Sequence, residues 1–292
     1  MSKLALYGRT YLDAEVEIPI DQLAVGKGKV DVEVRTVLGG FPCNAARALQ
    51  GRLRGEDMVV VTAISHLDLP RLRAALPPGT HVEAVHTEST DWPTVTVIVN
   101  PARECRLLRS GRPGDLCEAD LPQIPAAMLH VFGRVDAGLV DAVRRSAENT
   151  LLAWCAGAAG GAAIDQCDIA CVNTSEARTL LGMEGGSTHE LAARLAERGR
   201  PHCVRLVTGR GDAPAVAAMR LDGGVRTFEA EPAPVKQDQI RRLKGVGDAF
   251  AAHFVVEAVF DDAGHRRPQL DVEGALTAAQ AAATRFMTAA SV

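Results

Sequence analysis

The sequence predicts an α/β protein in which helices cover a mostly parallel β-sheet, with a second, smaller sheet attached to it. Short apolar segments, typical of strands buried on both faces, alternate along the chain with segments of helical periodicity. A second set of segments alternates apolar and polar residues with a period of two, as in a sheet with one wet face. The 292 residues, 47% of them hydrophobic, can form one large core, and no Pro/Gly-rich linker divides the chain.

The strands of the main sheet are expected where the short apolar runs occur. They are predicted at residues 4–8, 58–64, 129–132, 151–155, 169–172 and 204–208. Helices are predicted between them at residues 137–147 and 189–198. Ala45, Leu49 and Leu53 recur at intervals of four residues and predict the buried face of a further helix.

The period-two segments lie at residues 14–18, 30–35 and 94–99. We infer from them a small antiparallel sheet built from two insertions, at about 13–37 and 91–109, into a single domain that spans residues 1–292. Such a sheet could close over a ligand as a lid. Its uncovered face makes a homodimer through the lid plausible.

Composition argues against several classes of protein. The net charge is −4 and charges of both signs are interspersed, so no nucleic-acid partner is expected. The longest apolar stretch, residues 151–164, is too short and too rich in glycine to span a membrane. The seven cysteines form no C-x-x-C pair and the eight histidines have no metal-ligand spacing. We therefore expect reduced thiols in a cytoplasmic protein without a zinc site.

The segment Lys244-Gly-Val-Gly-Asp-Ala-Phe250 precedes a run of apolar residues with helical spacing, in which Phe250, Phe254, Ala258 and Val259 form a buried stripe. Two glycines before a helix let its first N–H groups face an anion, and the helix dipole adds positive potential there. Asp248 could then accept the proton of a hydroxyl that attacks a bound phosphoryl group. Taken alone, the motif is more often a glycine turn with Asp248 as a helix N-cap.

Three further features bear on this choice. Gly39-Gly40, followed by Asn44 near a helix start, could contact a polyol, although such turns are common. Asp13 could accept hydrogen bonds from two hydroxyls, although a solvated loop acid is the commoner case. Asn173 and Glu176 could hold magnesium-bound water near phosphates, although Asn-x-x-Glu is also a variant capping box.

Together and in this order, these motifs resemble those of the ribokinase-like (PfkB) carbohydrate kinases. Gly39-Gly40-x-x-x-Asn44-x-Ala46 is similar to the N-terminal signature of that family, and Asn173-x-x-Glu176 to its N-x-x-E motif. Residues 245–250 are similar to its C-terminal G-A-G-D-x-F signature. Residues 8–13 are similar to its first strand and sugar-binding aspartate, and Thr208-Gly-Arg-Gly211 to its nucleotide loop.

The resemblance implies a three-layer α/β/α kinase with a β-sheet lid that transfers a phosphoryl group from ATP, with Mg²⁺, to a hydroxyl of a sugar or sugar-like molecule. It implies Asp248 as the catalytic base and Gly245, Val246 and Gly247 as the anion hole. It implies acceptor binding by Asp13, Gly39, Gly40 and Asn44, and a magnesium network of Glu176 and Asn173 acting through water. The residues implied on the nucleotide side are Asn173, Thr208, Gly209, Gly211, Lys244 and Gln280.

Departures from the family pattern leave alternatives open. Arg242-Leu243-Lys244 stands where the family has Asp-Thr-x, which leaves activation by a monovalent cation open. These changes also keep open a ribokinase-fold binding protein with impaired catalysis. A nucleoside kinase of the same family is a second alternative. A nicotinamide-dependent oxidoreductase is not expected, because no G-x-G-x-x-G follows the first strand.

Overall fold

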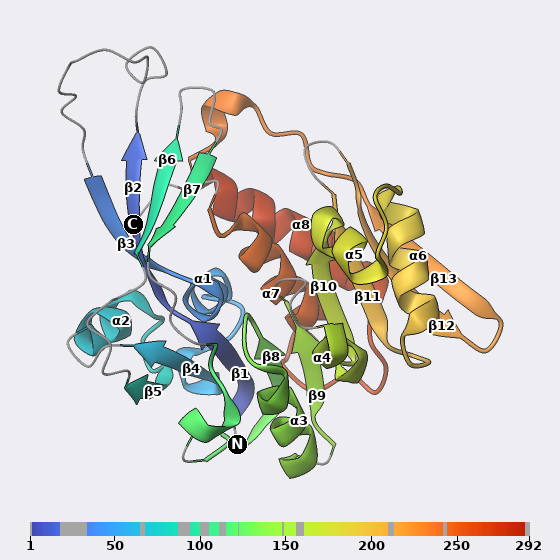
Figure 1. The fold of residues 1–292 in the computed structure, drawn as a ribbon, viewed down its shortest axis with the longest axis horizontal. Coiled ribbons are helices and arrows are strands. Elements are labelled where there is room, and N and C mark those ends of the chain that lie inside the picture. The colour runs from blue at the N-terminus through green and yellow to red at the C-terminus, as the bar shows by residue number, and fades with distance from the viewer. Residues whose placement is uncertain are drawn as a thin grey trace.

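The computed structural model describes residues 2–17, 34–64, 68–86, 94–99, 105–110, 115–121, 123–147, 149–155, 161–209, 213–241 and 244–289. Over these ranges the chain forms a nine-stranded central sheet with helices on both faces and a separate four-stranded sheet (Figure 1). The prediction of a mostly parallel, helix-covered sheet with a small second sheet is therefore confirmed.

The central sheet has the strand order β13-β12-β11-β10-β9-β8-β1-β4-β5. Neighbouring strands pair in parallel from β5 to β11, whereas β12 and β13 add an antiparallel edge. The strands are β1 (Ser2–Arg9), β4 (Met58–Ile64), β5 (His81–His86), β8 (Ala127–Phe132), β9 (Leu151–Trp154), β10 (Ile169–Asn173), β11 (Val204–Thr208), β12 (Ala215–Leu221) and β13 (Gly224–Ala230). All six predicted strands lie within or overlap these; β5, β12 and β13 were not predicted.

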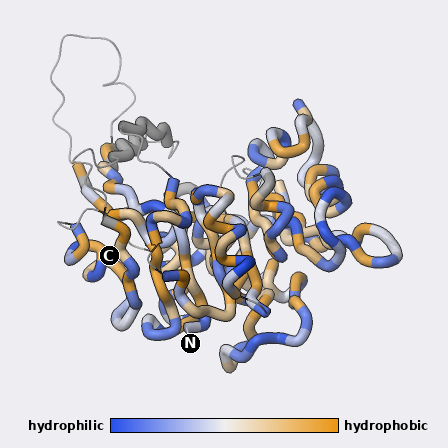
Figure 2. Tube along the Cα trace, turned by 60° about the horizontal axis from the view of Figure 1, so that its bottom comes forward, coloured by the Kyte–Doolittle hydropathy of each residue, from blue (hydrophilic) through white to orange (hydrophobic). Residues whose placement is uncertain are grey.

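Alternate residues of the strands pack into two cores, one on each face of the sheet. Leu4 and Leu6 of β1 lie in the core that also holds side chains of α1, α2, α7 and α8. Ala5 and Tyr7 lie in the other core, with side chains of α3, α4, α5 and α6. Figure 2 shows hydrophobic residues concentrated along the central strands, in agreement with strands buried on both faces.

The helices are α1 (Phe41–Ala48), α2 (Leu69–Ala75), α3 (Ala137–Ser146), α4 (Gly161–Gln166), α5 (Thr174–Leu181), α6 (Thr188–Arg198), α7 (Val246–Val259) and α8 (Val272–Thr288). The predicted helices at 137–147 and 189–198 agree with α3 and α6. The prediction that Leu53 continues the face of α1 is wrong, because α1 ends at Ala48; Leu53 is buried from a turn beyond it. The predicted stripe of α7 is buried, and burial extends around most of that helix.

The small sheet has the order β3-β2-β6-β7 and extends beyond one edge of the central sheet (Figure 1). Its strands are β2 (Tyr11–Glu17), β3 (Val34–Gly39), β6 (Thr94–Val99) and β7 (Cys105–Ser110). β2 pairs antiparallel with β3, and β6 with β7, but β2 and β6 pair in parallel. The prediction of a small antiparallel sheet is therefore confirmed for these two pairs and wrong for the pairing of β2 with β6. The reason is topological: β2 and β6 follow the parallel strands β1 and β5, so both leave the same edge of the central sheet. Residues 30–33 of the predicted strand lie outside the described residues.

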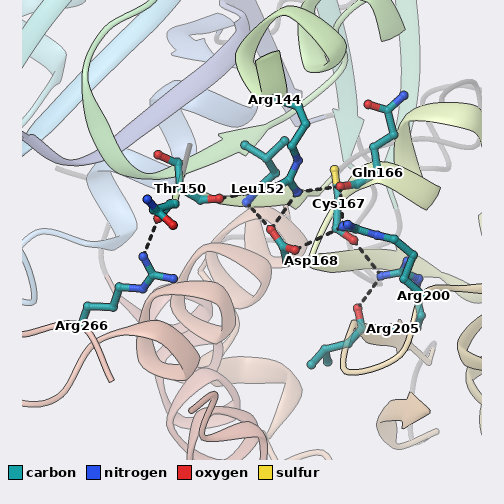
Figure 3. Close-up of polar contacts among 11 residues, drawn as sticks. Arg144, Thr150, Leu152, Gln166, Cys167, Asp168, Arg200, Arg205 and Arg266 are labelled. Atoms are coloured by element: carbon teal, nitrogen blue, oxygen red, sulfur yellow. Dashed lines mark hydrogen bonds and ion pairs between the residues drawn. The ribbon is translucent and has the colours of Figure 1, made fainter. Parts of the chain in front are cut away.

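At the amino-terminal ends of the central strands, Asp168 joins several neighbouring segments. It is the residue before β10. Its carboxylate accepts hydrogen bonds from the Leu152 amide (2.9 Å), Arg144 (2.9 Å) and Arg200 (3.2 Å), as Figure 3 shows. Arg144 and Arg200 also donate to the carbonyl of Gln166, the last residue of α4. These arginines satisfy carbonyl groups at the end of the helix, where its dipole favours positive charge.

Two negative findings apply to the described ranges. No helix there is long and apolar enough to cross a membrane. The six cysteines whose side chains are described are free thiols, and five of them are buried. The seventh, Cys105, has a side chain outside the described residues.

Candidate active site

Three segments that are far apart in the sequence meet beyond the carboxyl ends of the central strands. They are the start of β2, the first turn of α1 and the first turn of α7. Side-chain contacts join them: Asn44 of α1 donates to Asp248 of α7, and Lys244, which precedes α7, forms an ion pair with Asp13 of β2. Ligands of open α/β sheets bind at this edge, so the contacts mark a candidate active site.

The N-terminus of α7 is open. Its N-cap is Gly245, which has no side chain with which to satisfy the first N–H groups of the helix. A Cβ atom added to Gly247, in the first turn, would meet no atom within 4 Å. The interpretation of Asp248 as the N-cap is therefore wrong, since Asp248 is the third residue of the helix. No side chain caps the first-turn amides of α7, and an uncapped helix start is where anions can bind.

Gly245 also brings α7 close to α1. Its backbone has φ +82°, in the left-handed region that glycine adopts most easily. A Cβ atom at this position would lie 3.1 Å from Cγ and Nδ2 of Asn44. A side chain here would strain the turn and press on Asn44, so both the turn and the approach of the two helices depend on glycine.

Asp248 is half-buried, and its carboxylate Oδ2 accepts a hydrogen bond of 2.8 Å from Asn44 Nδ2. Burial removes water from the carboxylate and raises the pKa of Asp248 above its ordinary value. The Asn44 hydrogen bond and the positive charge of Lys244 act in the opposite direction, whereas Asp13 and Glu176 raise the pKa further. A carboxylate that holds protons more tightly than usual is a stronger base, which suits proton removal from an alcohol.

Asn44 is itself held in one orientation. Nη2 of Arg47, one turn further along α1, donates to Asn44 Oδ1 at 2.7 Å and to the carbonyl of Leu38 at 2.7 Å. Arg47 was not among the site residues predicted from the sequence. Its place beside Asn44 could have been found, because residues three positions apart lie on the same face of a helix.

Asp13 lies in β2 and its side chain is almost completely buried, so the interpretation as a solvated loop acid is wrong. A Cβ atom on Gly39 would lie 1.8 Å from Asp13 Oδ2, and one on Gly40 would lie 2.0 Å from the carbonyl oxygen of Arg9. Gly40 also has φ +94°. Within the described structure, the two glycines thus make room for Asp13 and for the end of β1.

The residues expected on the nucleotide side are less closely joined to this cluster. Asn173 and Glu176 form the capping box of α5: Glu176 N donates to Asn173 Oδ1 (3.0 Å), and Asn173 N to Glu176 Oε2 (2.9 Å). Glu176 is still near enough to act electrostatically on Asp248. Thr208 pairs with Asn173 across β10 and β11, and Gly209 follows it. Gln280 lies half-buried on α8, with no contact that joins it to the cluster in the described part of the chain. Gly211 lies outside the described residues.

Among the described residues, no group of three or more His, Cys, Asp or Glu side chains could hold a metal ion directly. Asn173 and Glu176 fit Mg²⁺ only as groups that contact it through water. Each already uses an oxygen in the capping box, and Mg²⁺ in phosphoryl-transfer sites keeps several waters and binds to phosphates. Contact through water is therefore compatible with these two residues.

Comparison with known proteins identifies the fold. No protein-family model and no curated protein sequence matches the chain. Solved structures do match over nearly the whole length. Ribokinase from Giardia lamblia has a TM-score of 0.77 at 17% identity, with 100% of this chain and 96% of that one covered. Adenosine kinase from Anopheles gambiae, in complex with a di(adenosine) tetraphosphate, has a TM-score of 0.75 at 15% identity, with 98% and 95% covered. Arabidopsis thaliana ribokinase, complexed with ribose and ATP, has a TM-score of 0.71 at 18% identity, with 100% and 95% covered.

Proposed function

We propose that this chain, which has the ribokinase-like fold, is a kinase that transfers the γ-phosphoryl group of ATP to a hydroxyl of a sugar or sugar-like small molecule. The observation that carries the proposal is the geometry of Asp248. Its carboxylate lies in the first turn of α7, beside open backbone amides, and is hydrogen-bonded to Asn44 from a second helix. A structural helix start needs neither a desolvated acid nor an open first turn, whereas phosphoryl transfer uses both.

In the proposed reaction, the acceptor lies between Asp13 and Asn44 with the reacting hydroxyl at Asp248. Asp248 takes the hydroxyl proton as the acceptor oxygen forms a bond to the γ-phosphorus. The bond from that phosphorus to the β–γ bridging oxygen breaks, and ADP leaves. The amides of residues 245–248 donate to the phosphoryl oxygens as charge develops on them, which stabilises the transition state without reorganisation.

The charges of the resting site suit this role. Asp13 and Asp248 bring two carboxylates into a poorly hydrated space, and Lys244 supplies a positive charge beside both. We infer that Lys244 exchanges Asp13 for the transferred phosphoryl when acceptor and ATP are bound. In this proposal Lys244 supplies charge that a bound monovalent cation could otherwise provide, so transfer should not require potassium.

Asn173 and Glu176 would hold Mg²⁺ through water on the nucleotide side. When bound there, the ion would neutralise charge on the β- and γ-phosphates. The chain's own contribution is to keep Glu176 in place through the capping box with Asn173. We also infer that Thr208 and Gly209, at the end of β11, border the nucleotide.

The small sheet of β2, β3, β6 and β7 is proposed to act as a lid over the acceptor. Asp13 belongs to β2, so movement of this sheet would move an acceptor contact together with the cover. The face of the sheet away from the site is the surface through which we propose that the protein forms a homodimer. Sedimentation of purified protein would test this, since a monomer at micromolar concentration would refute the dimer.

The kinase proposal is tested by Asp248→Asn, assayed by ADP release and product formation with a panel of pentoses, ketohexoses, their phosphates and nucleosides. We expect a loss of about 10²- to 10⁴-fold in kcat, the usual contribution of a general base. Asp222→Asn, at an exposed turn between β12 and β13, is the matched control and should retain activity. Transfer near the wild-type rate in Asp248→Asn would refute the mechanism.

The stability of Asp248→Asn shows whether lost activity reflects lost folding. A carboxyl group whose pKa is raised in the folded state favours folding below its ordinary pKa and opposes it once pH rises through the folded value. Removing this charge should therefore leave the protein at least as stable as wild type at pH 7, with the difference shrinking as pH falls toward 4. Thermal unfolding at several pH values measures this.

One observation favours a second function. Lys244 occupies an oxygen of Asp13, the carboxylate proposed to hold the acceptor. If this ion pair persists when ligand binds, the protein would bind sugars or nucleotides without efficient transfer. Tight binding by calorimetry, with no ADP release across the whole panel, would favour that binding protein over the kinase.

A further inference from the structure

We propose that Arg47 is a positioning residue: it fixes the amide of Asn44 so that its NH₂ group, and not its oxygen, faces Asp248. The inference rests on the proposed function, because it assigns a role within the same site. It deepens that function by naming the group that controls the proton affinity and the acceptor contacts of the base. Arg47 carries no part of the family resemblance described above.

The orientation of Asn44 follows from the hydrogen bonds at its two ends. A carboxamide has a donor end and an acceptor end of almost the same shape, so its environment decides which way it points. Arg47 Nη2 can only donate, and it lies 2.7 Å from Asn44 Oδ1. Asp248 Oδ2 can only accept when ionised, and it lies 2.8 Å from Asn44 Nδ2. The reverse orientation would set donor against donor at one end and oxygen against carboxylate at the other.

Arg47 is in turn held by the backbone. The same Nη2 donates to the carbonyl of Leu38, at the end of β3 and next to the glycine pair. The guanidinium therefore ties the first helix to the strand that enters it and leaves little freedom for the Asn44 amide. Nε of Arg47 is buried without a hydrogen-bond partner in the described part of the chain. Among the described residues, the guanidinium therefore donates to Asn44 and Leu38 and forms no ion pair with an acidic side chain.

The effect on Asp248 passes through Asn44. Among the groups that act on the pKa of Asp248 are the Asn44 amide from α1, Lys244 from the segment before α7, Asp13 from β2 and Glu176 from α5, and the Cys155 thiol also lies within electrostatic range. Arg47 is joined to Asp248 through the Asn44 amide, to whose oxygen it donates. Without Arg47 the amide can rotate, and Asp248 then loses the hydrogen bond that favours its ionised form.

A second consequence concerns the acceptor. The Asn44 NH₂ group gives one hydrogen to Asp248, and Oδ1 already accepts from Arg47. The N–H that remains is set to donate to an oxygen of the acceptor, and its direction depends on the hold that Arg47 has on Oδ1. Loss of Arg47 should raise KM for the acceptor as well as change the pH dependence.

The test is Arg47→Met, which keeps most of the side-chain volume and removes the guanidinium. We expect kcat/KM for the acceptor to fall about tenfold, as for the loss of one well-placed hydrogen bond. The acid limb of the pH–rate profile should move up by about half a pH unit to one unit. Arg47→Lys, which keeps one donor, should lie between Arg47→Met and wild type.

Two comparisons separate positioning from a general structural role. Arg52→Met removes another half-buried arginine, which pairs with Glu257 and with carbonyls at the far end of α7. It should lower stability and leave the acid limb unchanged. In an Asn44→Ala background, Arg47→Met should have a much smaller further effect on the profile, because the amide through which Arg47 acts is gone and only the direct effect of its charge is left. An unchanged acid limb in Arg47→Met, or a full additional effect in the Asn44→Ala background, would overturn the proposal.

A measurement without turnover separates this inference from the proposed function. The carboxyl carbon of Asp248 can be followed by NMR titration of protein labelled with ¹³C-aspartate, its signal identified by its disappearance in Asp248→Asn. The titration midpoint should be higher in Arg47→Met than in wild type. If no acceptor is ever phosphorylated but the midpoint rises, the positioning role stands and the kinase proposal fails. If transfer occurs but the midpoint does not move, the positioning role fails alone.

Discussion

Gly247 offers a test in which stability and activity should change in opposite directions. It lies in the first turn of α7 with φ outside the left-handed region, and a Cβ atom there would have no neighbour within 4 Å. As a helix residue alone, it would be improved by alanine, because glycine in a helix costs about 0.5–1 kcal/mol relative to alanine. Gly247→Ala should therefore gain about 0.5 kcal/mol, less than the interior value because the position is near the helix end.

The proposed function predicts the contrary effect on catalysis. The open space at Gly247 is where the transferred phosphoryl would rest against the amides of the first turn. A methyl group there would hold the phosphoryl away from its donors. Loss of one preorganised oxyanion donor typically lowers the rate about 10²- to 10³-fold, equivalent to about 2.7–4 kcal/mol. The rate penalty should thus exceed the stability gain several times over.

The assay combines thermal unfolding with steady-state kinetics for Gly247→Ala. For a chain of this size, the stability gain corresponds to a rise in Tm of about 1–2 °C. Gly185→Ala is the matched control, because a Cβ atom at Gly185 also meets nothing within 4 Å and Gly185 precedes α6, away from the site. It should change neither property greatly. Wild-type kcat/KM in Gly247→Ala would refute the idea that a phosphoryl group occupies this space.

Two further predictions concern the charges around the site and its frame. Lys244→Met removes the cation that pairs with the buried carboxylate of Asp13, so the protein should lose about 2–3 kcal/mol of stability. The loss should be smaller than for a fully buried pair, because the Lys244 side chain is 21% exposed. The acid limb of its pH–rate profile should also move to higher pH, because Lys244 lowers the pKa of Asp248. If both the stability and the profile stayed unchanged, that would contradict the ion pair. Asp168→Ala removes the acceptor shared by Leu152 N, Arg144 and Arg200 and should cost about 2–4 kcal/mol in urea unfolding. It should leave kcat of the folded protein nearly unchanged, and a stability loss below about 1 kcal/mol would show that Asp168 does not anchor β9 and β10.

Much of the fold could be predicted because its central strands are buried on both faces. Residues 58–64 and 204–208 are short, mostly apolar runs, and the structure places β4 and β11 over the same residues. The strand β13 could not be found in this way. It is an edge strand whose residues are all partly or fully exposed, so its composition is close to that of a loop. The parallel pairing of β2 with β6 depends on where distant strands end, which no local pattern contains.

The candidate site, like the fold, could be predicted from the sequence only in part. The glycines at 39, 40, 245 and 247 and the acid at 248 were visible as motifs, because backbone freedom at a helix start constrains residue type locally. The ion pair of Lys244 with Asp13 was not, since 231 positions of sequence separate its partners and only the fold brings them together. Arg47 was missed for another reason: its partner was identified, but the sequence does not show that an amide needs a second group to set its direction.

The features that define the site are unfavourable or unnecessary for folding alone. Burial raises the proton affinity of Asp248, which opposes folding at neutral pH. Gly247 weakens a helix turn in which alanine would meet no neighbour, and Gly245 provides a left-handed N-cap that leaves the first amides unsatisfied by a side chain. Side-chain caps are present on other described helices, such as the capping box of α5 and the aspartate caps of α3 and α8, but α1, which carries Asn44, also begins at an uncapped glycine, Gly40. Such departures from local stability are expected where function requires them. Their convergence on one helix start, against Asn44 and Arg47, is the strongest physical argument that α7 begins at a site of chemistry.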